Sequence, residues 1–390
     1  MTSGDERYLT TAEAARMLEV KPTTVYSYVS RGLLTRMPIL GRNSMFAESE
    51  VTDLIARGRE ARRPANPMEH VSTSLSLLAD DQLYYRGHRA ADLALWYTAE
   101  AVAELLWVGE VNDDHHPYAG PRAMLDSART AIATLPDSAR LTDKLRVAVA
   151  VAGAADPLRF DLEPAAVIRV GRALIGIMVD SIAPSITYES LAERLWPTLT
   201  SETPEPKLLD AALILLADHD LAVSTVAARV AASARAHPYA VVSAGLGALD
   251  GQYHGTASTE AYRFLVEAMP DPLSALSERL RAGRGVPGYG HRVYQRRDPR
   301  AVRLLELIRD VSPDAPALKT VHALSEHSFP NVDMALAVLM HEFGMRPDAG
   351  EAIFAIARTV GWIAHAMEEY REPGLRFRPL GVYIGPRVSD

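Results

Sequence analysis

Residues 285–294 read GVPGYGHRVY, and the tripeptide DPR follows at 298–300. Three glycines and a proline surround one histidine, His291, so the sequence predicts a turn here and not the interior of a helix. Glycine also lets the backbone come close to a ligand. We therefore expect a binding site in a loop, with His291 at its centre.

Three other short stretches place reactive side chains beside glycine or proline, or at a helix end. They are ADHD at 217–220, GQYHG at 251–255 and FPNVD at 329–333. In a chain of mostly helical pattern, packing alone gives no reason to set His254 and His291 among glycines. Together with several isolated arginines, these histidines and aspartates indicate acid–base chemistry on a carboxylate substrate.

The sequence around these stretches has the periodicity of helices. Apolar residues recur three and four positions apart in the segments 99–107, 224–237 and 352–370, whereas alternating patterns typical of strands are nearly absent. The sequence therefore predicts a mainly α-helical body. In the last segment, we expect His365 and Glu369 to form a solvent-exposed pair on one helix face.

Composition and motif searches exclude several classes of site. The chain has no cysteine, which excludes disulfides, cysteine-bound zinc, iron–sulfur clusters and thiol nucleophiles. No P-loop sequence occurs, residues 245–251 do not fit the GxGxxG fingerprint, and His341-Glu342 lacks the second histidine of a zinc protease. Because no run of about 18 apolar residues and no signal peptide is present, we expect a cytoplasmic protein without a membrane span.

Charge is unevenly distributed along the chain. The formal net charge is −8, yet residues 1–65 hold ten Lys and Arg against eight Asp and Glu, so their share is +2 and that of the remainder −10. The prolines of RRPANP at 62–67 interrupt any helical pattern and indicate a linker. We therefore predict an N-terminal domain at 1–62, a linker at 63–69 and a second domain at 70–390.

The N-terminal domain has the pattern of two short helices joined by a tight turn. The predicted elements are a helix over 9–18 capped by Thr10 or Thr11, a helix over 23–31 opened by Pro22 and ended by Gly32, a hairpin over 40–46, and a helix over 49–58. Two such helices form a helix-turn-helix, whose second helix enters the major groove of DNA. The hairpin then has the position of a wing.

This domain resembles the MerR-like and excisionase-like winged helices. The resemblance implies that Thr23, Thr24, Tyr26 and Tyr28 face DNA and that Arg42 in the wing contacts phosphate. Small domains of this kind also serve in protein interaction or dimerisation, and a net charge of +2 is weak for DNA binding. Both interpretations stay open.

The second domain closely resembles citrate synthase. The resemblance is carried by PGYGHRVY with DPR, by the spacing of the DH, HG, GYGH and NVD stretches, and by the segments 83–93 and 358–379. It implies a two-domain all-α fold with a small subdomain inserted at roughly 256–344, and an obligate homodimer with a shared active site. It also implies a Claisen condensation of acetyl-CoA with oxaloacetate that gives citrate and CoA.

The resemblance assigns roles to individual residues. Asp333 would be the base that takes a proton from the acyl thioester, His254 would hold the thioester oxygen, and His291 would donate to the ketone of the oxo acid. The carboxylates of the oxo acid would be held by His219, Arg300 and Arg358, and by Arg378 from the partner subunit. CoA would contact Val286, Gly288, Gly290 and Arg296. No metal is implied, and no cofactor beyond the CoA thioester, which is a substrate.

Several positions near these residues depart from the family pattern. Gln252, Ser258, Gln295 and Ala335 stand where family members commonly carry Pro, Asn, a basic residue and Ser. None of these changes removes a catalytic group, but the smaller Ala335 leaves open a longer acyl chain or a different oxo acid. One alternative activity is therefore 2-methylcitrate synthesis from propionyl-CoA. Another alternative is a DNA-binding regulator whose synthase-like domain senses CoA esters or oxo acids.

Overall fold

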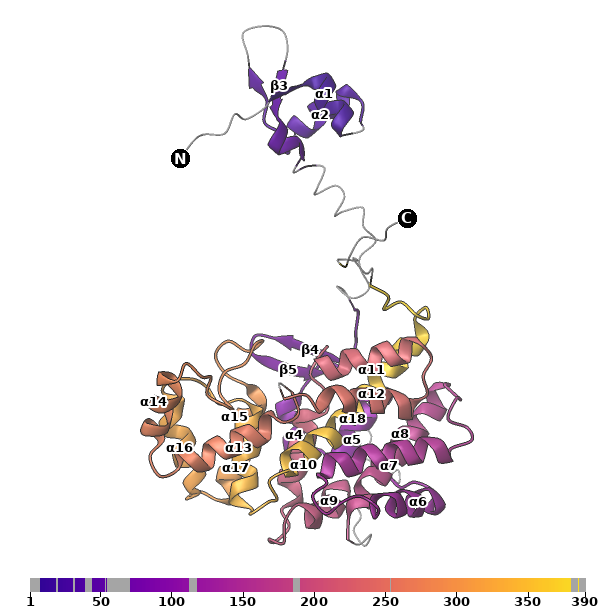
Figure 1. Ribbon diagram of the computed structural model, residues 1–390, viewed down its shortest axis with the longest axis vertical. Helices are drawn as coiled ribbons and strands as arrows, with labels where there is room; N and C mark the ends of the chain where they lie inside the picture. Colours follow the sequence, from indigo (N-terminus) through magenta and orange to yellow (C-terminus); the bar gives the residue numbers. More distant parts are fainter. Residues whose placement is uncertain are drawn as a thin grey trace. The chain divides into compact units, whose positions relative to one another are not determined.

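The computed structural model describes residues 8–18, 20–30, 32–38, 44–52, 54, 71–111, 118–184, 190–252, 254–379 and 385. The chain divides into two compact units (Figure 1). The first unit comprises Met1–Val71 with Pro379–Asp390, and the second comprises Ser72–Arg378. The predicted linker at 63–69 lies outside the described residues. None of the described helices is both long and apolar enough to cross a membrane.

The first unit combines short helices with a small sheet. Its elements are β1 (Tyr8–Thr10), α1 (Thr11–Met17), α2 (Pro22–Ser30), β2 (Met37–Pro38) and β3 (Ser44–Ala47). The Thr10 hydroxyl accepts from the N–H of Glu13, and the Glu13 carboxylate accepts from the N–H of Thr10, so a capping box starts α1. The predicted first helix is too long at its N-terminal end, because Leu9 lies in β1 and pairs with Phe46.

The expected hairpin is visible as two paired strands. β2 and β3 are antiparallel, and the sheet has the order β1-β3-β2. Residues 39–43, which include the predicted phosphate contact Arg42, lie outside the described residues. Residues 48–52 and 54 are helical, at the start of the predicted third helix, and the rest of that helix is likewise outside the described residues.

The second unit is mainly helical, as the sequence predicted. Its strands β4 (Ser76–Ala79), β5 (Gln82–Tyr85) and β6 (His88–Arg89) form an antiparallel sheet in that order. Its helices are α4 (Ala90–Trp96), α5 (Ala99–Val108), α6 (Arg122–Ile132), α7 (Leu141–Ala155), α8 (Pro164–Ile182), α9 (Leu191–Leu199), α10 (Pro206–Leu216), α11 (Val223–Ser233), α12 (Pro238–Leu249), α13 (Ala257–Ala268), α14 (Pro272–Arg281), α15 (Pro299–Val311), α16 (Pro316–Ser325), α17 (Val332–Glu342) and α18 (Ala349–Arg371). The sequence did not predict the sheet, because strands of two to four residues are too short to show a period.

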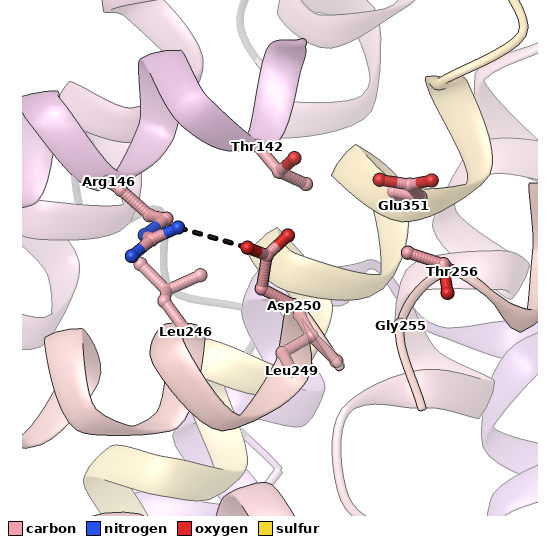
Figure 2. A pocket seen from close by; sticks show the side chains of 8 residues that line it. All are labelled: Thr142, Arg146, Leu246, Leu249, Asp250, Gly255, Thr256 and Glu351. Carbon is pink, nitrogen blue, oxygen red and sulfur yellow. Dashed lines mark hydrogen bonds and ion pairs between the residues drawn. The ribbon is translucent and has the colours of Figure 1, made fainter. Parts of the chain in front are cut away.

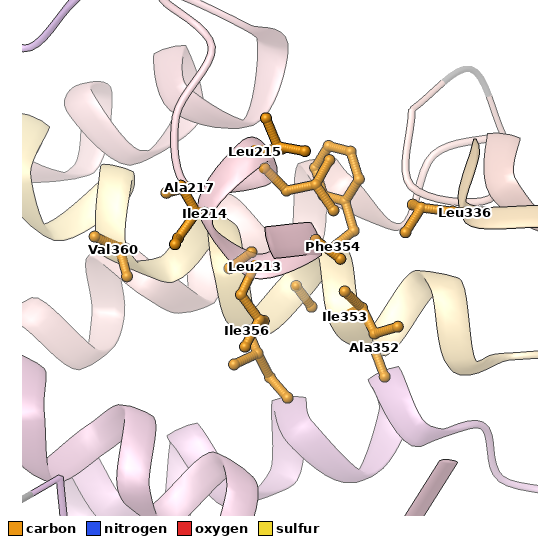
Figure 3. Packing of buried hydrophobic residues seen from close by; sticks show 14 of the residues in the cluster. Leu213, Ile214, Leu215, Ala217, Leu336, Ala352, Ile353, Phe354, Ile356 and Val360 are labelled. Atoms are coloured by element: carbon orange, nitrogen blue, oxygen red, sulfur yellow. The ribbon is translucent and has the colours of Figure 1, made fainter. Parts of the chain in front are cut away.

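Helix α18 forms the centre of the second unit, where α8, α10, α11 and α12 pack around it (Figure 1). Figure 3 shows part of this core, to which Leu213 and Leu215 of α10 and Phe354 of α18 belong. Because neighbours cover α18 on several sides, His365 and Glu369 are fully buried. The predicted solvent-exposed pair is therefore wrong.

Helices α13–α17 gather at one side of the second unit (Figure 1). α13 packs on α17 and α14, α14 packs on α16, and α15 contacts both α17 and α10. The subdomain predicted at roughly 256–344 spans these helices, and its exact bounds stay a prediction. α15 and α17 each begin beside the loop that carries His291, and this arrangement places the candidate site.

Candidate active site

The turn that carries His219 follows α10 and is held by the small sheet. The Tyr85 hydroxyl of β5 bonds to both the carbonyl (3.0 Å) and the N–H (3.2 Å) of Asp218. The Ser76 hydroxyl of β4 donates to the Asp218 carboxylate and accepts from the N–H of Asp220 at 3.0 Å. The sheet that the sequence did not predict therefore fixes the buried side chain of His219 from both flanking residues.

A buried chain of charges supports Asp218. Nη1 of Arg229 lies 2.7 Å from Nδ1 of His365, and Nε2 of His365 lies 3.3 Å from the Asp218 carboxylate. Arg229 also pairs with Glu369 (3.2 Å), and Glu369 pairs with Arg376 (2.6 Å). Burial alone would raise the pKa of Asp218, but His365 beside it holds that pKa below its usual value. Asp218 is therefore a fixed anion next to His219.

The two histidines predicted for the oxo acid lie against each other. The ring centroids of His219 and His291 are 5.2 Å apart, and the Tyr294 hydroxyl bonds to Nε2 of His219 at 3.0 Å. Nδ1 of His291 accepts from the N–H groups of Val293 (3.0 Å) and Tyr294 (3.4 Å), so the neutral ring carries its hydrogen on Nε2. That nitrogen lies 3.5 Å from Nη2 of Arg300. His291 therefore presents a hydrogen-bond donor beside a buried guanidinium.

Arg300 is held rigidly in the first turn of α15. Its Nε and Nη2 donate to the two carboxylate oxygens of Asp298 at 2.9 and 2.8 Å. Asp298 also accepts from the N–H of Val332, the first residue of α17, at 3.0 Å. A bidentate, charge-assisted pair fixes the orientation of both groups. Asp298 therefore joins Arg300 to the helix that carries Asp333.

The glycine-rich loop is anchored to the start of α17. The Asn331 side chain caps this helix by accepting from the N–H of Asp333 (3.0 Å), and its Nδ2 donates to the carbonyl of Gly290 (2.9 Å). The N–H of Asn331 donates to the carbonyl of Gly288 at 2.9 Å. Gly288 has φ 79°, and a Cβ there would lie 2.9 Å from Cβ of Met334, so glycine is required. The predicted CoA-contacting glycines thus have a structural role as well.

Asp333 stands out by its lack of partners. It is half-buried, and within the described part of the chain its carboxylate makes no hydrogen bond or ion pair. Burial raises the pKa of Asp333 to about 6, against the opposing effect of Arg300 and Arg358. At pH 7 the group is therefore mostly ionised, and it is more basic than an ordinary aspartate.

His254 and Arg358 both pack on Phe354. The His254 ring centroid lies 5.5 Å from that of Phe354, and the Arg358 guanidinium carbon lies 4.6 Å from it on the ring face. Nε2 of His254 bonds to the Ser224 hydroxyl at 2.7 Å. Nε of Arg358 donates to the Leu216 carbonyl at 2.8 Å, but its Nη2 is buried without a partner among the described residues. An unpaired buried guanidinium nitrogen is expected where an anionic ligand binds.

The histidines of the site are neutral at pH 7. Burial, together with Arg358, lowers the pKa of His254 to about 4. Burial and Arg300 lower the pKa of His291 to about 4, and burial lowers the pKa of His219 well below its usual value. Neutral imidazoles can still donate a hydrogen bond from one nitrogen, which suits a site that binds anions.

The remaining predicted residues lie apart from this group or at its edge. Arg378 is exposed at the end of the second unit. Arg296 is exposed as well, and its N–H donates to the Asp81 carboxylate at 3.0 Å. Val286 is half-buried and packs against the hydrophobic core. The residues that the structure brings together are His219, His254, His291, Arg300, Asp333 and Arg358.

Sequence reasoning missed Phe354 and Ser224. Phe354 precedes Arg358 by one helical turn and shares its face of α18, so the spacing alone could have drawn attention to it. Ser224 gives no such sign. It is 30 residues from His254 in the chain, and only the packing of the helices brings the two side chains together.

In the first unit, the residues predicted to face DNA lie on α2. Thr23 is exposed, Tyr26 is 46% exposed, and Thr24 is half-buried. Tyr28 packs instead against the small core around Val25, because it lies three residues further along the same helix face. The α2 surface available to a partner is therefore narrower than predicted.

The helical fold and this group of neutral histidines, buried arginines and a basic aspartate define a condensing acyltransferase. Residues 65–380 match the family "Citrate synthase, C-terminal domain", and residues 8–59 match "Helix-turn-helix domain". The chain belongs to the citrate synthase family and carries an N-terminal helix-turn-helix domain.

Similar proteins with assigned activities include both citrate and 2-methylcitrate synthases. The citrate synthase of Acidithiobacillus ferridurans is 30% identical over 348 residues, which are 78% of this chain and 89% of that protein. The 2-methylcitrate synthase of Mycobacterium tuberculosis is 30% identical over 339 residues, which are 78% and 85% of the two chains. The two relatives are equally similar, so the comparison establishes the family but not the acyl substrate.

Solved structures of the family share the fold. Citrate synthase from Thermotoga maritima has a TM-score of 0.67 and 28% identity, covering 84% of this chain and 97% of that chain. Citrate synthase from Thermoplasma acidophilum, a ternary complex with carboxymethyl coenzyme A and oxaloacetate, has a TM-score of 0.68 and 25% identity, covering 82% and 95%.

Proposed function

We propose that the second unit condenses acetyl-CoA with oxaloacetate and releases citrate and CoA. The observation that carries this proposal is the basic Asp333, without a partner among the described residues, beside buried arginines and neutral histidines. A base without ion pairs suits proton removal from carbon, and the buried cations suit a dicarboxylate. The complex of the Thermoplasma acidophilum relative contains oxaloacetate and a CoA derivative, which supports the same substrate pair.

In this reaction Asp333 removes a proton from the methyl group of the thioester. Such a methyl group is a very weak acid, so the developing enolate oxygen needs a hydrogen-bond donor at the same moment. His254 supplies that donor as a neutral imidazole, held by Ser224. The pKa of about 6 at Asp333 leaves the base ionised at pH 7 and raises its basicity.

The enolate carbon then attacks the ketone carbon of oxaloacetate, forming the new carbon–carbon bond. Nε2–H of His291 donates to the ketone oxygen and passes its proton to the alkoxide as it forms. Water then hydrolyses the thioester of the condensed product, which breaks the carbon–sulfur bond and releases citrate and CoA.

Arg300, Arg358 and His219 hold the two carboxylates of the oxo acid. Nη2 of Arg358, which has no partner among the described residues, can donate a hydrogen bond to one of these carboxylates. Arg378 reaches the site of the partner subunit in a homodimer, since in its own chain it is exposed.

A thiol-release assay of the purified protein, run across acyl-CoAs and oxo acids, tests the proposal. Acetyl-CoA with oxaloacetate is expected to give the highest kcat/KM. A preference for propionyl-CoA would instead assign 2-methylcitrate synthesis, the alternative that Ala335 and the equal similarity of the two kinds of relative leave open. No thiol release with any pair would reject the condensation.

We infer a second function for the first unit, sequence-specific DNA binding. The helix-turn-helix match and the exposed side chains of Thr23 and Tyr26 on α2 favour it. A homodimer would present two such helices, so the target is an inverted repeat. A selection from random DNA at low salt, followed by gel shift, should recover that repeat. If no sequence is enriched, the first unit is a protein-interaction module.

A purely sensory second unit is the less favoured reading of this combination. Ligand binding alone requires the arginines but not an unpaired base, and Asp333 is retained in the site. Condensation and DNA binding can therefore belong to the same chain.

A further inference from the structure

A cluster of charges beside the turn between α12 and α13 takes no part in the reaction above. Arg140, at the start of α7, donates from Nη2 to Asp250 (2.6 Å) and Asp143 (3.1 Å), and from Nη1 to Glu351 (3.3 Å). Asp250 also pairs with Arg146 of α7 at 3.1 Å, and Figure 2 shows the two side chains facing each other. The cluster therefore joins α7, α18 and the end of α12.

This cluster holds both ends of the turn that carries His254. Asp250 follows α12 and precedes His254 by four residues. Thr259, in the first turn of α13, donates from its hydroxyl to Glu351 at 2.6 Å. Glu351 also accepts from Arg140. The Arg140 guanidinium therefore contacts one end of the turn directly, at Asp250, and the other end through the Glu351 carboxylate, which binds Thr259.

Two backbone hydrogen bonds hold the described residues of this turn. The N–H of His254 donates to the carbonyl of Gly251 (2.9 Å), and the N–H of Gly255 donates to the carbonyl of Leu249 (2.8 Å). A Cβ on Gly255 would lie 2.5 Å from that carbonyl oxygen, so the backbone is closely packed here. A displacement of Asp250 would therefore be passed to His254 through the carbonyl of the adjacent Gly251.

We propose that Arg140, Asp250 and Glu351 are positioning residues that set the place of His254 relative to the thioester. None of the three contacts the groups that bind the oxo acid. Glu351 lies one turn before Phe354 on α18, the residue on which the His254 ring packs, so the same cluster also orients that ring. The inference rests on the proposed role of His254 at the thioester.

The test is the Asp250→Asn variant, which keeps the size of the side chain and removes its charge. Asp250 is partly exposed, so the variant is expected to fold, and a thermal melt checks this. Hydrogen exchange of a peptide covering residues 249–259 should become about tenfold faster. In the thiol-release assay, kcat should fall about 10- to 100-fold because a misplaced group loses alignment. The KM of the oxo acid should change less than about twofold.

Two further variants separate positioning from general damage. Asp250→Glu restores the charge and should recover most of the exchange protection and of kcat. Arg263→Gln removes an exposed ion pair with Glu260 on α13, one turn beyond Thr259, and should leave both quantities unchanged. If Arg263→Gln matched Asp250→Asn, the effect would be general loosening of α13 and the proposal would be wrong.

Failure of this inference is distinguishable from failure of the proposed function. If the wild-type protein releases no thiol, condensation is rejected, and the exchange measurement still decides whether the cluster holds the turn. If Asp250→Asn exchanges as slowly as the wild type, or exchanges faster with kcat unchanged, the positioning role is overturned.

Discussion

The two sides of the candidate site hold their charges in opposite ways. On the side proposed to bind the oxo acid, Arg300 is locked to Asp298 by two hydrogen bonds, and Asp218 beside His219 is the end of a buried chain of charges. On the thioester side, the Asp333 carboxylate has no partner among the described residues, and its pKa is raised to about 6. Arg300 is thus held by a partner carboxylate, whereas no side chain among the described residues pairs with Asp333.

This difference follows from what each side must do. A group that binds an anion works best when its orientation is fixed before the ligand arrives, and ion pairs provide that. A base must keep a raised pKa, which partners such as arginine would lower. The two sides can therefore be disrupted separately, and the predictions below run from the largest expected effect to the smallest.

Asp333→Ala should abolish proton removal from the thioester and leave binding of the oxo acid intact. Turnover should fall at least about 10²–10⁴-fold, since the variant has no base for the carbon acid. Binding of oxaloacetate, measured by calorimetry, should stay near the wild-type value because Arg300 and His219 remain. Near-normal turnover would show that another group is the base. Arg358→Gln is the matched control, and it should weaken oxaloacetate binding.

The pH dependence of kcat/KM should reflect the raised pKa of Asp333. Asp333 must be ionised to act, so kcat/KM should fall about tenfold per pH unit below the pKa of about 6 and level off above it. The histidines do not interfere in this range, because the pKa values of His254 and His291 lie at about 4. A profile from about pH 5 to about pH 8 measures this. A profile that stays flat from about pH 8 down to about pH 5 would mean that the base is not Asp333.

The sequence indicated which residues gather on the proposed oxo-acid side. It did not indicate the buried interactions that hold them in place. The short motifs around His219, His291 and Arg300 can be recognised by neighbouring glycine or proline, or by their spacing. The helical periodicity predicts α18 correctly. The burial of His365 could not be predicted, because its helix carries polar residues at a spacing that equally suits a surface. Only the packing of α11 on α18 brings Arg229 to it.

The sheet β4-β5-β6 illustrates the same limit. Its strands are too short for a period, yet Ser76 and Tyr85 fix the turn of His219 across more than a hundred residues of sequence. Likewise, burial in the folded chain raises the pKa of Asp333, and no local sequence pattern encodes that burial. Residue types were therefore predictable, whereas the environments that tune them were not.

Mixed dimers should show whether the oxo-acid side is complete within one chain. Arg378 is exposed in its own chain, which fits an action across a subunit interface. If it acts there, a purified dimer of one Arg378→Ala chain and one His291→Ala chain has one intact site and one doubly damaged site. Its activity should be about half that of the wild type. An inactive mixed dimer would place Arg378 in the site of its own chain.

The smallest effect is expected from removing the helix-turn-helix. Both sides of the site lie within residues 72–378, and the first unit has its own core around Phe46. Deleting residues 1–65 should therefore leave kcat/KM within about twofold of the wild type while abolishing DNA binding. Phe46→Ala in the full chain is the matched control, since loss of this fully buried ring should unfold the first unit alone. If both changes lowered condensation by the same factor, the first unit would be a structural part of the catalytic body, and the contrast between the two sides would no longer be a property of the second unit by itself.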